Sequence, residues 1–246
     1  YARSGRFTSS NENLQNLPRD AKRFIGSTDG YIISADFAQL ELRTIACLAE
    51  DHTMINLFKE GADLHDYVAE RLFGSGFNKR ERNIAKTYSF SLLYGAGAPT
   101  VREMMIASTG IVLDVSEVEE GKRQWLSTFP GIQKWQRQGW RNHDARRPTV
   151  TPGDRKAVSK RFTDHLSIQN QGAGAEVARI ALHDMVQAGV PLINFVHDSY
   201  IAEVEAGYEA ISEQIYRSMK LGWEMAPFDK YGLHMPVQVG VARNLK

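Results

Sequence analysis

The apolar runs that predict core β-strands lie near the two ends of this 246-residue chain, before Glu50 and after Phe162. The sequence between them has mainly helical patterning. If both ends contribute strands to one sheet, the middle of the chain must leave that sheet and return to it. We therefore predict an α+β fold, with an antiparallel-sheet domain and an inserted, mainly helical subdomain.

Turn-forming residues indicate where the expected strands and helix at the two ends of the chain begin and end. The first 24 residues are polar and rich in turn formers, which predicts an extended loop. A helix is expected over residues 39–48, and the dipeptide His197-Asp198 is expected to form the tight turn of a β-hairpin. Strands are predicted over residues 31–36, 191–196, 200–204 and 235–241.

The middle of the chain is expected to be helical from about residue 51 to residue 134. Asp114 or Ser116 is a candidate N-cap within it. A turn over residues 149–155 is expected to join two short strands, and a further helix is expected over residues 168–186. Helix breaks are predicted at Gly74-Ser-Gly76, at Gly95-Ala-Gly97-Ala-Pro99 and at Pro130-Gly131.

Composition excludes several classes of protein. Hydrophobic residues make up 42% of the chain, which is ordinary for a globular protein, and no apolar run approaches the length of about 18 that crosses a membrane. The N-terminus lacks the apolar core of a signal peptide. The single cysteine, Cys47, excludes an internal disulfide and a zinc site made of several cysteines. We expect a protein of a reducing, cytoplasm-like compartment with no membrane partner.

Positive charge is concentrated between residues 134 and 161, although the net charge of the whole chain is only +1. Two acids, Asp144 and Asp154, interrupt this stretch. It fits either contact with a phosphate backbone or a solvated basic helix and turn, and the pattern alone does not separate the two. Its cations are Lys134, Arg137, Arg141, Arg146, Arg147, Arg155, Lys156, Lys160 and Arg161.

Asp36 and Asp198 each stand where a predicted strand ends. Either acid taken alone fits a turn or a helix cap. Two carboxylates at neighbouring strand ends would instead repel each other unless a cation lay between them. Their hard oxygen ligands suit Mg²⁺, which also binds waters and substrate phosphates.

Four residues spaced by four form a slowly winding stripe on one predicted helix: Arg82, Lys86, Phe90 and Tyr94. Cations on such a stripe suit a polyphosphate. The alternative is an ordinary amphipathic helix whose aromatic residues are core and whose cations are solvated. Gly95-Ala-Gly97 follows the stripe and suits a helix end.

These segments resemble the motifs of family A DNA polymerases. Asp36-Phe-Ala-Gln-Leu-Glu41-Leu-Arg43 is similar to motif A, Arg82 through Gly95 is similar to motif B, and Val196-His197-Asp198 is similar to motif C. Further similar segments occur in family order along the whole chain. They are Ser4-Gly5-Arg6-Phe-Thr-Ser-Ser10, Asn13-Leu-Gln15-Asn16-Leu-Pro18, Gly61-Ala-Asp-Leu-His65, Phe129-Pro-Gly131-Ile132 and Gln171-Gly-Ala-Gly-Ala175.

The resemblance implies a palm over residues 1–49 and 163–246, with fingers over residues 50–162. It also implies a template-directed DNA polymerase whose partners are primer-template DNA and deoxynucleoside triphosphates, in a bacterial or phage-like context. By resemblance, two Mg²⁺ ions are bound by Asp36, Asp198 and the backbone carbonyl of Phe37.

The remaining roles are also carried over from the family motifs. Arg82 and Lys86 would be catalytic cations that grip the triphosphate together with His65. Residues implied to contact the nucleotide are Gln39, Glu41 as a steric gate against the 2′-hydroxyl, Phe90 against the base and Tyr94 at the templating position. Residues implied to contact DNA are Arg6, Gln15, Asn16, Gln171 and His197.

Two departures and two rivals accompany this interpretation. Ser199 stands where motif C usually has a second acid, and a hydroxyl is a poorer metal ligand than a carboxylate. The chain begins just before the first matching segment, so we expect the thumb and any nuclease domain to lie outside it. A single-subunit RNA polymerase shares the motif B pattern and His-Asp-Ser, but Gln39 and Glu41 fit the DNA enzymes. A non-catalytic nucleic-acid-binding relative is the other alternative, and the sequence does not indicate an oligomeric state.

Overall fold

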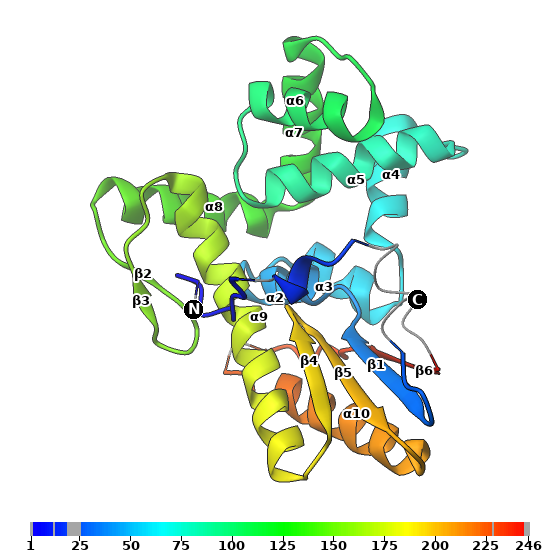
Figure 1. Ribbon diagram of the computed structural model, residues 1–246. Coiled ribbons are helices and arrows are strands. Elements are labelled where there is room, and N and C mark those ends of the chain that lie inside the picture. The colour runs from blue at the N-terminus through cyan, green and yellow to red at the C-terminus, as the bar shows by residue number, and fades with distance from the viewer. Residues whose placement is uncertain (1, 12, 19–25, 228, 244–246) are drawn as a thin grey trace.

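The computed structural model describes residues 2–11, 13–18, 26–227 and 229–243. It has an α+β fold, as predicted, in which a small antiparallel sheet carries helices and a larger helical lobe stands beyond it (Figure 1). Of the loop predicted over the first 24 residues, residues 1, 12 and 19–24 lie outside the described residues. The described helices are η1 (Leu14–Asn16, a 3-10 turn), α2 (Leu40–Leu48), α3 (His52–Lys59), α4 (Leu64–Phe73), α5 (Lys79–Leu93), α6 (Ala98–Thr109), α7 (Val115–Thr128), α8 (Pro130–Asp144), α9 (Phe162–Gln187) and α10 (Tyr208–Glu224).

The main sheet has the strand order β4-β5-β1-β6, and every neighbouring pair in it is antiparallel. Both ends of the sequence contribute to it, because β1 comes from the first part of the chain and the other strands come from the last part. A separate small hairpin joins β2 to β3. The strands are β1 (Tyr31–Phe37), β2 (Thr149–Val150), β3 (Lys156–Ala157), β4 (Leu192–Val196), β5 (Ser199–Val204) and β6 (Val237–Ala242).

Helices α9 and α10 pack against each other, and α10 also contacts β1 and β6 (Figure 1). Tyr200 of β5 is fully buried there, and its hydroxyl donates a hydrogen bond to the carbonyl of Ala178 on α9 at 2.7 Å. Phe37 packs edge-on against Tyr200, with 6.3 Å between ring centroids. The end of β1 that carries Asp36 and the start of β5, which directly follows Asp198, therefore rest on a packed core.

The helical lobe is built from α4 to α7, and α8 runs between this lobe and the sheet-bearing part (Figure 1). Asp51 joins the two regions, because one carboxylate oxygen accepts from the amide of Met54 in α3 and the other accepts from the amide of Ile132 in α8. A Cβ on Gly131 would stand 2.6 Å from Cα of Asp51, so this close approach requires glycine. One hydrophobic cluster extends from Ile33 in the sheet to Trp125 in the lobe.

Most predicted elements are present, and the differences have local causes. Helix α9 begins at Phe162, six residues before the predicted start at residue 168, because the side chain of Asp164 accepts from the amide of Arg161 and caps it. Helix α10 was not predicted, although Ile211, Ile215 and Met219 recur at helical spacing. No described helix has both the length and the apolar character needed to cross a membrane.

Candidate active site

Asp36 and Asp198 are brought together by the register of two strands. Asp36 pairs with Ser199 across β1 and β5, and Asp198 is the residue immediately before Ser199. Paired Cα atoms in an antiparallel sheet lie about 4.5 to 5.5 Å apart, so the two acids occupy adjacent places at one end of the sheet. The predicted hairpin is present, since Val196 pairs with Ser199 and only His197 and Asp198 lie in the turn.

Two residues beside these acids have strained backbones. His197, which precedes Asp198, has φ of +59°, and Gln39, three residues after Asp36, has φ of +58°. Each such left-handed residue other than glycine costs about 1 to 2 kcal/mol, and conformations of this kind cluster at functional sites. Strain on both sides of the acid pair therefore supports a functional role for this end of the sheet.

Asp198 is half-buried, whereas Asp36 is exposed. Burial raises the pKa of the Asp198 carboxyl above its usual range, the guanidinium of Arg6 partly opposes this rise, and the carboxylate of Glu41 adds to it. Burial disfavours the ionised form of this carboxyl, and a cation bound beside it would favour that form. The local chemistry therefore fits a hard cation such as Mg²⁺.

The described residues contain no group of three or more His, Cys, Asp or Glu side chains arranged to hold a metal ion. The carboxylates of Asp36 and Asp198 are a pair of hard oxygen donors, and a Mg²⁺ ion bound by such a pair keeps waters and substrate phosphates in its other positions. Ser199 does not supply the second acid that motif C usually has at this place.

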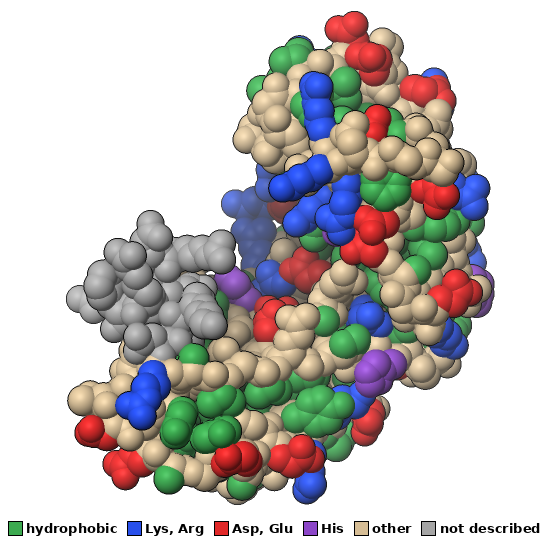
Figure 2. All heavy atoms as spheres, turned by 90° about the vertical axis from the view of Figure 1, so that its right-hand side faces the viewer, with side chains coloured by type: hydrophobic (Ala, Val, Ile, Leu, Met, Phe, Trp, Pro, Cys, Tyr) green, Lys and Arg blue, Asp and Glu red, His purple; other side chains and the backbone are tan. Residues whose placement is uncertain are grey.

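Helix α5 carries Arg82, Lys86 and Phe90, and Tyr94 is its C-cap. Asn78 and Glu81 form a reciprocal capping box that fixes its start. Figure 2 shows Lys and Arg side chains gathered on the part of the helical lobe that faces the sheet, above a hollow between the two parts.

His65, Lys86 and Phe90 form one group between α4 and α5. The His65 and Phe90 rings lie 5.5 Å apart, and Lys86 Nζ lies 5.9 Å from the centre of the Phe90 ring, which is 40% exposed. His65 is buried, and its Nδ1 has no hydrogen-bond partner among the described residues. Burial and the nearby cations lower the pKa of His65, so the ring is neutral near pH 7 and can donate or accept.

Arg82 is held by two acids that the sequence did not single out. Its guanidinium pairs with Asp63 at 2.9 Å and also with Asp66. Asp63 additionally caps α4 by accepting from the amide of His65 at 2.7 Å. All three side chains of this ion pair network are at least 35% exposed, so the pairs are worth about 1 kcal/mol or less each and can exchange for a phosphate.

Glu41 stands at the centre of a second network. Its carboxylate pairs with Arg6 and accepts a hydrogen bond from the Tyr94 hydroxyl at 2.7 Å. Burial and the Glu41 carboxylate raise the pKa of Tyr94, so the phenol remains a donor at all ordinary pH values. The structure thus connects Glu41, the predicted steric gate, to two other predicted site residues. These are Tyr94, predicted at the templating position, and Arg6, a predicted DNA contact.

Asn170 is a further member of this network that the sequence analysis missed. It is fully buried, and its amide nitrogen donates to the Tyr94 hydroxyl at 3.0 Å and to the Glu41 carbonyl at 3.1 Å. Its amide oxygen accepts from Thr44 at 2.7 Å. The sequence feature that could have identified Asn170 is its position directly before Gln171, a predicted DNA contact on α9.

The other predicted DNA contacts lie around the hairpin and α9. Gln15 donates from Nε2 to the carbonyl of Phe195 on β4 at 3.1 Å, which holds η1 beside the hairpin that presents the exposed His197. Asn16 ends η1, and Gln171 is half-buried on α9. The structure brings Arg6 to Glu41 and Gln15 to the hairpin, and it places Asn16 next to Gln15 in η1.

The model of DNA polymerase family A matches residues 1–246. The chain belongs to DNA polymerase family A. It is 28% identical over 238 residues to DNA polymerase I of Aquifex aeolicus, covering 88% of this chain and 40% of that protein. It is 31% identical over 216 residues to the DNA polymerase of Mycobacterium phage D29, covering 83% of this chain and 34% of that one.

A solved structure shares the fold of this family A chain. It is the POL domain of Pol1 from M. smegmatis, in complex with DNA primer-template and dNTP. The TM-score is 0.84 at 24% identity, and the match covers 99% of this chain and 46% of that one. The chain thus spans less than half the length of the relatives described here.

Proposed function

We propose that this chain is the palm and fingers portion of a template-directed DNA polymerase, which adds deoxynucleotides to a primer 3′-hydroxyl. One observation carries the proposal: strand register sets Asp36 beside Asp198 at the end of the sheet that is joined, through Glu41 and Tyr94, to the end of α5. We assign the palm to residues 1–49 and 163–246 and the fingers to residues 50–162. Membership of the family supports this assignment.

The acids would hold two Mg²⁺ ions together with the Phe37 carbonyl. Magnesium bound there would lower the pKa of the 3′-hydroxyl and offset the negative charge that develops on the pyrophosphate. Lys86 and Arg82 would bind the triphosphate as cations, with Arg82 exchanging Asp63 and Asp66 for phosphate oxygens. Neutral His65 would donate a hydrogen bond to a phosphate oxygen.

Nucleotide and template selection would depend on the aromatic residues and on Glu41. Phe90, which is 40% exposed, offers a face for the incoming base, and Tyr94 offers one for the templating base. Tyr94 and Arg6 hold the Glu41 carboxylate, and an ordered carboxylate would act as a steric gate against a ribose 2′-hydroxyl. Gln39, the N-cap of α2 and two residues before Glu41, would also contact the nucleotide. Arg6, Gln15, Asn16, Gln171 and His197 would contact primer-template DNA.

Primer extension tests the proposal most directly. With Mg²⁺ and about 50 mM salt, where phosphate contacts are strong, we expect the chain to extend a primer with dATP opposite thymine in preference to ATP. Preference for ATP would instead favour a single-subunit RNA polymerase. Binding of primer-template without extension would favour a non-catalytic relative.

Replacement of one acid tests the metal site. We expect Asp198→Asn to lower the extension rate at least about 100-fold, because a ligand for the catalytic cations is lost, while binding of primer-template persists. The same variant should raise the thermal midpoint of the metal-free chain, because a costly buried charge is removed. Glu203→Gln, on the exposed side of β5, is the matched control and should leave extension unchanged. Retained turnover by Asp198→Asn would exclude Asp198 from the metal site.

A further inference from the structure

Two surface hollows follow one another along α8, away from the acid pair. The first, of about 270 Å³, is bordered by Gly95 at the end of α5, by Arg137 and Trp140 of α8, and by Phe162 of α9. The second, of about 610 Å³, lies between the end of α8 and the segment that follows β3, and it is also bordered by Trp140. Trp140 therefore stands between the two hollows, and the first hollow begins at Gly95, the residue after Tyr94.

Trp140 presents an open aromatic face on this surface. It is 55% exposed, and it packs edge-on against Phe162 with 5.3 Å between ring centroids. The His143 ring also lies 6.5 Å from the indole, and much of the indole remains in solvent. Large exposed aromatic rings on a charged surface are typical stacking sites for unpaired bases, since every base has a π-face.

The second hollow is lined by three cations, Arg146, Arg147 and Lys160, and by one acid, Asp144. None of the three takes part in an ion pair among the described residues, in contrast to the neighbouring Arg161, which pairs with Asp164. Cations that lack acidic partners retain their full attraction for phosphate.

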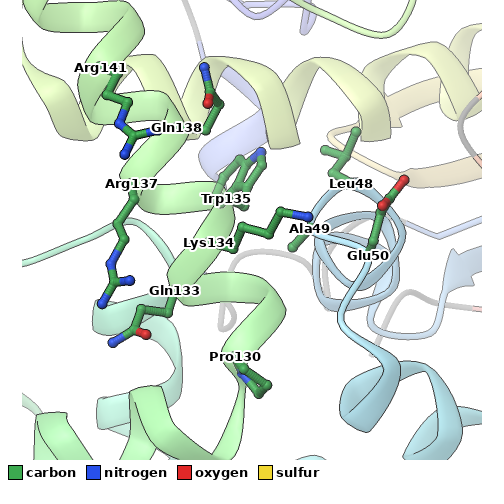
Figure 3. A pocket seen from close by; sticks show the side chains of 10 residues that line it. All are labelled: Leu48, Ala49, Glu50, Pro130, Gln133, Lys134, Trp135, Arg137, Gln138 and Arg141. Carbon is green, nitrogen blue, oxygen red and sulfur yellow. The ribbon is translucent and has the colours of Figure 1, made fainter.

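The basic character continues along α8 beyond the two hollows. Figure 3 shows Arg137 and Arg141 one helical turn apart and directed to the same side, while Lys134 reaches toward the end of α2 near Ala49 and Glu50. These residues line a third hollow of about 440 Å³. Six of the nine cations of the basic cluster therefore line hollows on this side of the molecule, beside an exposed aromatic residue: Lys134, Arg137, Arg141, Arg146, Arg147 and Lys160.

We propose that the surface bordered by Trp140, Arg137, Arg146, Arg147 and Lys160 binds single-stranded DNA, namely the unpaired template strand before it reaches Tyr94. The identification of this strand as the template rests on the proposed function, because Gly95 directly follows Tyr94, the residue assigned to the templating position. Stacking on Trp140 and phosphate contacts in the second hollow would together hold the strand without reading its sequence.

Fluorescence anisotropy of a labelled 12-nucleotide DNA strand tests this surface without any need for catalysis. Three cations are removed in the variant Arg146→Ala, Arg147→Ala, Lys160→Ala. We expect the slope of log affinity against log salt to become shallower by about 2, since each phosphate contact on a single strand contributes about 0.7. Trp140→Ala should weaken binding about ten-fold, and Trp140→Phe should restore most of the affinity.

A second triple variant, Arg71→Ala, Arg123→Ala, Arg217→Ala, removes the same charge from exposed helix positions elsewhere and is the matched control. An equal loss of affinity in this control would show that binding depends only on the overall charge of the chain, and it would overturn the proposed site. So would failure of the unmodified chain to bind the strand, unchanged binding by Trp140→Ala, or tighter binding of an RNA strand of the same sequence.

Primer extension on templates with one or with 12 unpaired nucleotides separates this inference from the proposed function. Extension with the single-nucleotide overhang requires Asp198 but not the α8 surface. If extension fails while the binding losses occur as expected, the polymerase proposal is wrong and the single-strand site remains. If extension occurs but the chain binds long and short overhangs equally, the single-strand site is wrong.

Discussion

At the scale of single residues, Asn170 connects three elements that the candidate site requires. Its donors hold Tyr94 at the end of α5 and the backbone of Glu41 in α2, and its acceptor holds Thr44. Replacing a buried side-chain amide that makes all these hydrogen bonds is costly, because its partners are then left without hydrogen bonds. Asn170 is therefore a positioning residue for the Glu41 and Tyr94 pair.

We expect Asn170→Leu to lower the preference for dATP over ATP about ten-fold, because Tyr94 and Glu41 lose the donor that orients them. The free energy of unfolding should fall by about 1 to 3 kcal/mol. Thr44→Val is the control: it removes a hydroxyl from the same network but leaves both donors to Tyr94 and Glu41 in place. Steady-state incorporation of both nucleotides provides the measurement, and an equal loss of preference in the two variants would show a merely structural role.

At the scale of elements, the packing of α10 on α9 supports the strands that carry the acids. Gly222 of α10 lies against α9, where a Cβ would stand 2.6 Å from the carbonyl oxygen of Val177 and 2.9 Å from Cβ of Ala181. A backbone oxygen cannot move aside as a flexible side chain can. The two helices approach this closely because glycine occupies the contact.

Gly222→Ala should therefore destabilise the protein by about 1 to 3 kcal/mol through overpacking, in spite of the better helix propensity of alanine. Gly174→Ala, within α9, is the matched control, since its Cβ would meet flexible Leu40 atoms at 3.4 Å and more. That change should be neutral or slightly stabilising. Urea unfolding midpoints would measure both, and equal midpoints for the two variants would contradict this account of the α9 and α10 contact.

At the scale of the whole molecule, two buried histidines make stability depend on pH. Burial lowers the pKa of both His65 and His165. His165 is 1% exposed and shares a hydrogen bond of 2.8 Å with Thr149 through Nδ1, while its Nε2 has no partner among the described residues. Below the unfolded pKa of about 6.5, the unfolded chain binds protons that the folded chain does not.

The free energy of unfolding should consequently fall as the pH is lowered from 7.5 to 5.5, by up to about 1.4 kcal/mol per histidine for each pH unit below 6.5. The raised pKa of Asp198 acts in the opposite sense, so the informative quantity is the difference between variants. His165→Gln, which can keep a hydrogen bond to Thr149, should show a shallower fall in urea unfolding experiments. An unchanged pH dependence would mean that His165 does not titrate in this way.

Features that depend on neighbours in the sequence were predictable from it. Apolar runs, turn residues and a spacing of four indicated β1, the hairpin with Asp198 in its turn, and the helix bearing the stripe from Arg82 to Tyr94. Asp114, one of the two predicted candidates, is the N-cap of α7. These features were accessible because strand pattern, turn chemistry and capping are set by residues a few places apart.

Contacts between distant segments were decided only by the tertiary structure. The register that sets Asp36 opposite Ser199, the pairing of Arg82 with Asp63 and Asp66, and the link from Asn170 to Tyr94 join residues separated by up to 163 positions. No local pattern encodes such pairs, because they follow from how the sheet and helices pack as whole elements. The sequence by itself determined which groups are present and on which elements, and packing determined which of them meet.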